Sequence, residues 1–386
     1  MTDVLSDAFL DRMRLTTDPL ADTAVAGVLN RGTAYEWTID KLLDQLVSNS
    51  SPLPPGLPQE IQDYFHTTAQ LPNWVDMGKV QTGEQFFEAC GAECVLVLFC
   101  KSLPECYAAH RGAEVLFSTG RLMGKGKNLK PLTRRIMETA QFLLNVMAPG
   151  GLGPQGAGLV TTQKIRLIHA SIRTFLKQQN WDVANYGEPI NQEDMAGTLL
   201  AFSLETLEGL KILKIDVSEA QELAYLHAWN AVGAILGIDE RLLMPDLASA
   251  RALWARIRER QFGTSEAGRE LTASLLAFLE QIVLGNTLKE MPILLMHQLM
   301  DPQMIQWLGV PDKHSWLDEV LTKALEVIFR IETSLEIEDP RFRKVVSLFS
   351  EKLLQGLVIS WNGEKQVAFE IPPSLRGNWP DLSPGS

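Results

Sequence analysis

One histidine lies where a helical reading of the sequence otherwise places apolar side chains. The stripe has an apolar residue at every third or fourth position, with His169 among Ile165, Ile172 and Leu176. Burying an imidazole on such a face costs free energy unless its ring nitrogens find partners. The position therefore has two interpretations: a core histidine with satisfied hydrogen bonds, or a ligand for a metal or cofactor.

Two arginines lie close to this histidine, about one helical turn on either side. Arg166 precedes His169 by three residues and Arg173 follows it by four, so all three share one side of the helix. An imidazole can be the axial ligand of haem iron, and guanidinium groups pair well with carboxylates such as the haem propionates. The pattern fits a haem site in which His169 would be the iron ligand and the two arginines would be haem-binding residues, and the core interpretation of His169 stays open beside it.

The composition limits the class of protein that could contain such a site. The chain has 386 residues, 46% of them hydrophobic, and a formal net charge of −12. A chain of this length can bury one large core or two ordinary ones. The negative charge is spread along the sequence, which argues against a nucleic-acid-binding protein.

The N-terminal residues and the apolar runs bear on location. The first residues are acidic and lack the basic stretch and apolar run of a signal peptide. The densest apolar run, residues 94–100, is too short to cross a bilayer. We therefore expect a cytoplasmic protein without a transmembrane segment, whose oligomeric state the sequence leaves open.

Most of the chain has the pattern of helices, and several helix ends are marked. Asn191 is a predicted N-cap for a helix over residues 192–210. Glu193 and Asp194 fall in its first turn, where the helix dipole favours carboxylates, so we expect capping and dipole roles for them. His227 lies on another apolar helix and is predicted to pack in the core.

The predicted loops and linkers divide the chain into three predicted parts. Residues 1–70 form an N-terminal helical segment and linker, 71–285 the helical core, and 286–386 a helical extension. Alternating apolar residues around Asn362 and Gly363 predict a short β-hairpin near the C-terminus. The predicted fold is all-α, with a large helical domain, peripheral helices and this single hairpin.

Two further patterns favour a structural interpretation. The glycine-rich run at 151–156 has the spacing of a dinucleotide-binding loop, but a predicted helix precedes it and Pro154 interrupts it. The chain has four cysteines, Cys90, Cys94, Cys100 and Cys106. Their spacings match no common zinc site, so we expect Cys90 and Cys94 to be small apolar residues on one helix face.

The His169 helix and the segment after it resemble one family of haem-dependent oxygenases. The family's Arg-x-x-His-Ala-x-x-Arg pattern is met over residues 166–173, and Pro-Ile-Asn-Gln-Glu-Asp stands at 189–194. The family includes bacterial latex-clearing proteins (rubber oxygenases) and the endoplasmic-reticulum oxygenase of fungal mycophenolic acid synthesis. The resemblance covers roughly residues 71–277 and implies an all-helical fold with a globin-like core. It also implies haem b, dioxygen and oxidative cleavage of carbon–carbon double bonds in isoprenoid chains.

The resemblance assigns residues to both sides of a haem. His169 corresponds to the proximal iron ligand. The family's distal Arg-x-x-Lys-Thr motif is matched by Arg135, Glu138 and Thr139, so a glutamate replaces the lysine here. Arg135 and Thr139 would shape the oxygen site. Glu138 could serve as a base that removes an allylic proton, or it could be a surface residue paired with a neighbouring arginine.

The favoured function is a haem b-dependent oxygenase that uses dioxygen on an unsaturated apolar substrate, isoprenoid or lipid-like. Rubber itself is not expected as the substrate, because the sequence shows no export signal. One alternative is a non-catalytic haem-binding sensor of oxygen or redox state with a globin-like core. Another is a carrier of apolar ligands that has no haem.

Overall fold

A computed structural model describes residues 4–29, 56–119, 130–154, 156–282 and 291–312, together with residues 346, 349, 350 and 353. Within these ranges the chain is built from helices, and the one β pairing is an isolated bridge between Ala109 and Phe262. The all-α prediction is confirmed there. The hairpin predicted around 362–363 lies outside the described residues. None of the described helices combines the length and apolar character needed to cross a membrane.

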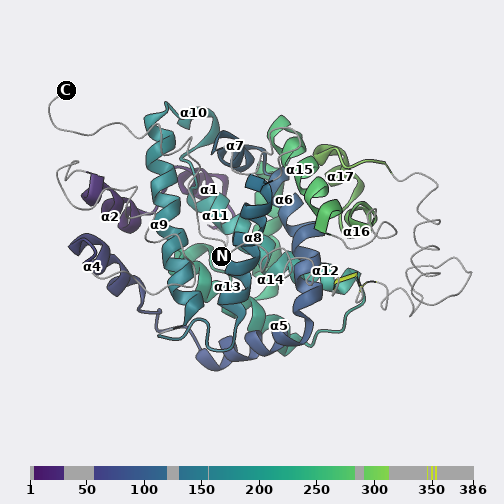
Figure 1. The fold of residues 1–386 in the computed structure, drawn as a ribbon, viewed down its shortest axis with the longest axis horizontal. Coiled ribbons are helices and arrows are strands. Elements are labelled where there is room, and N and C mark those ends of the chain that lie inside the picture. The colour runs from purple at the N-terminus through teal and green to yellow at the C-terminus, as the bar shows by residue number, and fades with distance from the viewer. Residues whose placement is uncertain are drawn as a thin grey trace, which may run out of the picture.

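Figure 1 shows the helices of the described ranges. The first half contains α1 (Asp7–Arg14), α2 (Pro19–Leu29), α4 (Gln59–Thr68), α5 (Met77–Val97), the π-helical turn η1 (Leu98–Ser102), α6 (Leu103–Ala108), α7 (His110–Thr119), α8 (Lys130–Met147) and α9 (Ala157–Gln178). The second half contains α10 (Val183–Tyr186), α11 (Gln192–Phe202), α12 (Leu204–Ile212), α13 (Glu219–Ile235), the 3₁₀ turn η2 (Glu240–Leu242), α14 (Leu247–Gln261), α15 (Glu266–Ile282), α16 (Met291–Leu299) and α17 (Pro302–Leu308).

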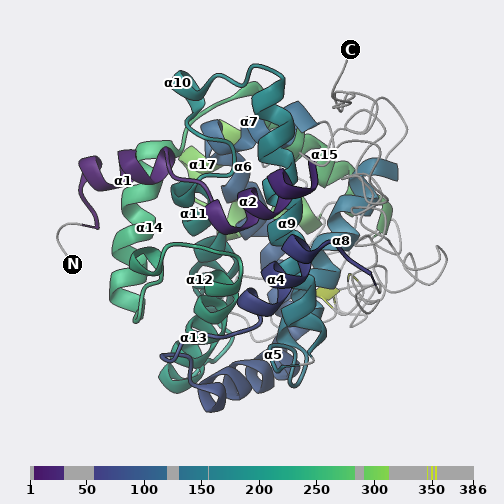
Figure 2. The same ribbon diagram turned by 90° about the vertical axis from the view of Figure 1, so that its left-hand side faces the viewer.

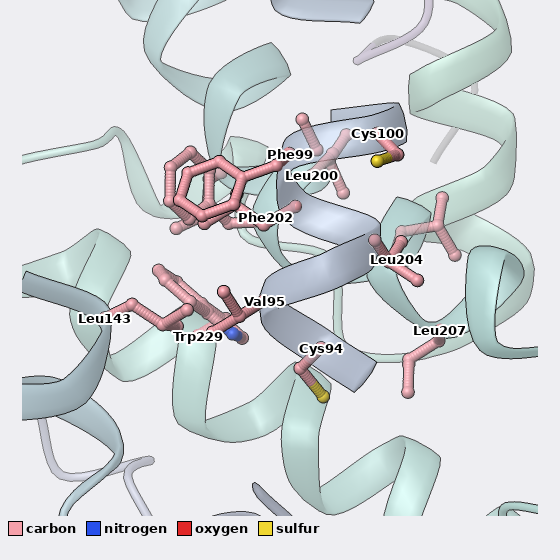
Figure 3. Close-up of a cluster of buried hydrophobic side chains, with 14 of the residues drawn as sticks. Cys94, Val95, Phe99, Cys100, Leu143, Leu200, Phe202, Leu204, Leu207 and Trp229 are labelled. Atoms are coloured by element: carbon pink, nitrogen blue, oxygen red, sulfur yellow. The ribbon is translucent and has the colours of Figure 1, made fainter. Parts of the chain in front are cut away.

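A large apolar core lies where α5 and α13 run along each other, with α8, α11 and α12 beside them. Figure 3 shows Trp229 of α13, Phe202 of α11 and Phe99 of η1 gathered beside Val95 of α5. The rings of Phe202 and Trp229 lie 5.3 Å apart between centroids. This core also includes side chains of α1, α16 and α17, so both ends of the described chain contribute to it.

A second apolar cluster lies on the opposite side of α9, under α2 and α4. Figure 2 shows α2 in front of α9 and α1 beside α14. Helix α9 is therefore covered on both sides, and its inner side faces α8 and α13. The boundaries predicted near residues 70 and 285 stay a prediction.

The predicted helix ends are largely confirmed, with one correction. The side chain of Asn191 accepts a hydrogen bond from the Asp194 N–H at 3.0 Å, as expected for the N-cap of α11. The predicted single helix over 192–210 is wrong, because the backbone breaks at Ser203 and separates α11 from α12. The Ser203 hydroxyl donates to the Leu199 carbonyl at 2.8 Å, a side-chain bond that bends helices at serine.

The connection between α8 and α9 is a tight turn, as the glycine run predicted. Gly150 has φ +72°, and its N–H donates to a Glu84 carboxylate oxygen at 3.0 Å. A Cβ added at Gly151 or Gly158 would approach the Asn145 carbonyl oxygen to 2.3 or 2.5 Å. Helix α8 and not a strand precedes the turn, so this run lacks the setting of a dinucleotide-binding loop.

Candidate functional site

An apolar cavity of about 250 Å³ lies inside the helical body; we call it the central cavity. Its walls come from α6, α7, α8, α9, α11, α13 and α14, and aromatic side chains such as Phe142, Phe202, Trp229 and Trp254 contribute to them. One water molecule needs roughly 10–15 Å³ measured in this way. The cavity therefore has room for a group much larger than solvent.

Helix α9 presents to the cavity the face that its sequence period predicted. Ile165, Ile168, His169 and Ile172 line it. His169 is half-buried, with an apolar residue one position before it and one turn on either side. Leu176, the last member of the predicted stripe, packs instead in the cluster under α2 and α4. The only histidine among the described wall residues is thus His169.

Helix α8 supplies the polar groups that share this cavity with His169. Glu138 and Thr139 line it together with Ile136 and Phe142. Glu138 is 0% exposed, so the interpretation of this residue as a surface carboxylate is wrong. Arg135 lies on the same helix, but its side chain is outside the described part of the structure. The structure therefore brings His169, Glu138 and Thr139 to one cavity from two consecutive helices.

The structure does not bring the two arginines of the His169 helix to that cavity. Arg166 donates from Nε and Nη2 to the two carboxylate oxygens of Asp18 at 2.6 and 2.7 Å. Its Nη1 donates to the Ile235 carbonyl at 2.9 Å. Arg173 donates from Nε to Asp22 at 2.8 Å. Both guanidinium groups thus hold α9 to α2 and the residue before it, and neither lines the cavity.

A polar cluster that the sequence did not predict lies at the N-terminus of α11. Asp194 lines the cavity and accepts from Arg14 Nη1 at 2.8 Å, although the two residues are far apart in sequence. Glu193 is fully buried and accepts from Arg260 Nε at 2.8 Å and Gln261 Nε2 at 2.9 Å. Burial raises the pKa of Glu193, and the two arginines oppose this shift. The two carboxylates lie in the first turn of α11 and anchor α1 and α14 to it, while Asn191 caps the helix.

His227, Cys90 and Cys94 lie outside the wall of the central cavity, whereas Cys106 is part of it. His227 is half-buried, and its Nε2 accepts from the Asp76 N–H at 2.9 Å at the start of α5, so the core position predicted for it is wrong. Cys90 and Cys94 share α5 with their sulfur atoms 3.8 Å apart. Among the described residues, no group of three metal-binding side chains is found.

The chemistry of the central cavity fits a haem. A haem is a large apolar macrocycle whose iron takes an imidazole as an axial ligand and needs an open side for oxygen. Here one histidine stands in an aliphatic and aromatic lining, and a carboxylate and a hydroxyl from α8 line the same space. No lysine or arginine is among the described wall residues, so cations for the propionates are not identified there.

Comparison with known proteins identifies the family of this chain. Residues 111–331 match the family described as ER-bound oxygenase mpaB/B'/rubber oxygenase, catalytic domain. The chain belongs to this family. The family match confirms the resemblance inferred from residues 166–173 and 189–194.

Two relatives define how far the similarity extends. The rubber oxygenase of Streptomyces sp. (strain K30) is 26% identical over 274 residues, 70% of this chain. The matched region spans 65% of that relative's length, a little under two thirds. A latex clearing protein solved in the closed state superposes with a TM-score of 0.68 at 22% identity, over 90% of this chain and 91% of the other. That superposition shows a common fold.

Proposed function

We propose that this chain is a haem b-dependent oxygenase that uses dioxygen to oxidise an unsaturated, apolar substrate of isoprenoid or lipid-like character. The observation that carries the proposal is the place of His169, in the wall of an apolar cavity that also contains Glu138 and Thr139. Membership of an oxygenase catalytic-domain family supports the same reaction class. The cytoplasmic location expected from the sequence stays a prediction.

His169 would hold the haem from α9, and Ile165 and Ile172 would pack beside it. When bound, haem iron supplies the activation of dioxygen that an oxygenase requires. The isoleucines and the aromatic residues keep water away from the cofactor. A dry cavity strengthens each electrostatic contact made by the few polar groups in its wall.

Two residues of α8 would act on the substrate side. The Glu138 carboxylate lies in the apolar wall, where it can accept a proton from an allylic carbon next to a double bond. The Thr139 hydroxyl, on the next residue, can donate a hydrogen bond to an oxygen atom in the cavity. These roles need no lysine at the position that Glu138 occupies.

The lining also limits the substrate. A cavity with mostly aliphatic and aromatic walls binds hydrocarbon chains by removing apolar surface from water. The rubber oxygenase relative is named for an isoprenoid polymer, which supports a substrate of isoprenoid type. We infer a substrate with a hydrocarbon chain that contains at least one double bond.

Purified protein tests the cofactor directly, because bound haem gives a strong Soret absorption band. We expect a stoichiometric haem content in the wild type and its loss in His169→Ala. His227→Ala is the matched control, since His227 is also half-buried but lies outside the cavity. A His169→Ala protein with unchanged haem content and spectrum would show that another residue binds the iron.

Oxygen consumption separates the oxygenase from the sensor. We expect uptake of dioxygen when haem-loaded protein is mixed with a short isoprenoid hydrocarbon or a polyunsaturated lipid. Haem binding without uptake for either class of substrate would favour the sensor. A protein that binds these apolar molecules and no haem would favour the carrier.

A further inference from the structure

A second pocket, of about 410 Å³, lies beside the central cavity; we call it the polar pocket. It is formed where α7 and α9 end and where the loop containing α10 begins. Polar and aromatic side chains supply most of its described wall: Glu114, Ser118, Gln179, Asp182, Trp181 and Tyr186. Nothing in the proposed oxygenase chemistry uses these residues.

The polar pocket and the central cavity share a wall residue. Thr119, the last residue of α7, lines both of them. Helix α7 turns Val115 towards the central cavity and Glu114 towards the polar pocket. Helix α9 also contributes to both walls. His169 lines the central cavity, and Gln179, the C-cap of this helix, lines the polar pocket. Those ten residues correspond to about 15 Å along the helix.

The described charges of the polar pocket are negative. Glu114 and Asp182 are its two ionisable carboxylates, and no lysine or arginine is among its described wall residues. The C-terminus of α9 also ends there, and the partial negative charge of a helix C-terminus favours cations and hydrogen-bond donors. Anionic groups such as phosphate or carboxylate would meet repulsion from all three sources.

The wall of the polar pocket is held in place by its own contacts. Trp181 Nε1 donates to the Gly187 carbonyl at 2.8 Å, and the rings of Trp181 and Tyr186 lie 5.3 Å apart. The Asp182 side chain accepts from the Asn185 N–H at 3.1 Å and so caps α10. Burial raises the pKa of the Glu114 carboxyl, and a hydrogen bond with Ser118 opposes the shift.

We propose that the substrate is an amphiphile whose apolar chain lies in the central cavity and whose polar end lies in the polar pocket. The polar end is uncharged or cationic, as in an alcohol or an amine, and is not a phosphate or carboxylate. The inference rests on the proposed function for what happens to the chain, but the head-group preference is a property of binding alone.

A matched ligand series tests the preference with haem-loaded, full-length protein. The ligands share one unsaturated isoprenoid chain and end in a methyl, alcohol, amine, carboxylate or phosphate group. Affinity is followed by quenching of tryptophan fluorescence and checked by calorimetry. We expect the alcohol and the amine to bind about fivefold or more tighter than the two anions, the size of one partly exposed charge contact. Tighter binding of either anion would overturn the proposal.

Two variants locate the preference. Glu114→Gln should narrow the difference between the amine and the carboxylate several-fold and leave the methyl-ended ligand unchanged. Asp182→Asn keeps a good N-cap for α10 and should act in the same direction. Glu88→Gln, an exposed carboxylate on α5, is the control and should change nothing. Identical head-group selectivity in wild type and Glu114→Gln would also overturn the proposal.

The binding and turnover readouts can fail separately. Head-group selectivity that depends on Glu114, without oxygen uptake for any ligand, would leave the polar pocket assigned and remove the oxygenase function. Oxygen uptake, combined with a ligand affinity that depends neither on the head group nor on Glu114, would support the oxygenase function and overturn the assignment of the polar pocket.

Discussion

Glu138 distinguishes this chain most clearly at the scale of single residues. The resemblance assigns it to the position where the family motif has a lysine, and the structure buries it fully in the wall that Thr139 shares. A carboxylate and a lysine at one position cannot do the same work, because the carboxylate accepts protons and hydrogen bonds while the ammonium donates them. Chemistry on this chain's substrate should therefore depend on proton acceptance at Glu138.

We expect Glu138→Gln to slow turnover by about 10²–10⁴-fold, the usual contribution of a general base. Haem content and the visible spectrum should stay at wild-type values, because His169 is untouched. Glu138→Asp should recover part of the rate. Oxygen-uptake kinetics at saturating substrate measure the effect, and an unaltered kcat in Glu138→Gln would remove this carboxylate from the mechanism.

Lys164, five residues before His169 on α9, is 0% exposed, and burial lowers its pKa from 10.5 to about 8. Between these two pH values the lysine is mostly neutral in the folded protein and mostly protonated in the unfolded chain. The free energy of unfolding should therefore rise as pH rises from about 8 to about 10.5. Lys164→Met should stabilise the protein at pH 7 by about 1–3 kcal/mol.

Urea unfolding at neutral and alkaline pH measures this effect. The gain from Lys164→Met should shrink as pH rises from about 8 through 10.5, because neither state holds the proton once the pH is above 10.5. Lys177→Met, on the exposed side of α9, should show no comparable pH dependence. Destabilisation by Lys164→Met at neutral pH would mean that the lysine makes a favourable contact stronger than its burial cost.

Sequence reasoning at this scale predicted the helix face on which His169 lies and missed the partners of Arg166 and Arg173. The helical period alone places His169 on the inner face of α9, since its neighbours on that face are apolar. The same period puts the arginines nearby but cannot show that Asp18, just before α2, and Asp22, in its first turn, reach them. Pairing between residues some 150 positions apart is set by tertiary packing, which one sequence does not reveal.

At the scale of elements, the turn η1 contains a buried charge cluster that joins it to α6 and α12. Lys101 Nζ donates to Glu105 at 2.7 Å and also pairs with Glu205. Burial raises the pKa of Glu105 to about 8, and Lys101 opposes the shift. Leu103 and Cys106, which are close to Lys101 and Glu105 in the sequence, line the central cavity.

Lys101→Met should destabilise the fold by about 3–5 kcal/mol, because it leaves two buried carboxylates without their cation. Replacing all three residues, as Lys101→Met, Glu105→Leu and Glu205→Leu together, should cost less than the single change. Denaturant unfolding of both variants measures the difference. A single variant as stable as the wild type would contradict a role for this cluster in holding η1 to α12.

Element types were predictable here, but one break was not. Asn191 marks the start of α11 in the sequence, and the structure has this N-cap. The break at Ser203 has no glycine or proline to announce it, and Ser171 makes the same hydroxyl bond to the carbonyl four residues earlier inside the continuous helix α9. Serine is common within helices, so this signal is visible only once coordinates exist.

At the scale of the whole molecule, the N-terminal helices are built into the helical body around the site. Arg14 of α1 reaches Asp194 in the cavity wall, and Arg260 of α14 pairs with Asp11 at 2.6 Å. Asp18, the residue before α2, pairs with Arg166, and Asp22 of α2 pairs with Arg173. This segment therefore neutralises both arginines of α9. The predicted N-terminal segment thus shares its contacts with the predicted core.

Removal of residues 1–29 should abolish cooperative folding. Each arginine of α9 would lose its carboxylate, at about 3–5 kcal/mol for a pair that stays buried, against a typical total stability of about 5–15 kcal/mol. Thermal unfolding and haem content of the truncated protein measure the outcome. Removal of residues 1–3 alone is the control. A truncated protein that melts like the wild type would establish residues 1–29 as a dispensable segment.

The tight turn between α8 and α9 has a consequence for mutational surveys of this protein. A Cβ at Gly156 would come within 2.1 Å of the Gly151 carbonyl oxygen, and one at Gly158 within 2.6 Å of the Val146 backbone. Any substitution at these glycines would shift the two helices that carry Glu138 and His169 relative to each other. A screen for lost activity would therefore find variants of these glycines as inactive as variants of Glu138 or His169. Measurements of cofactor content and folding on each variant would distinguish a displaced helix from a lost catalytic group.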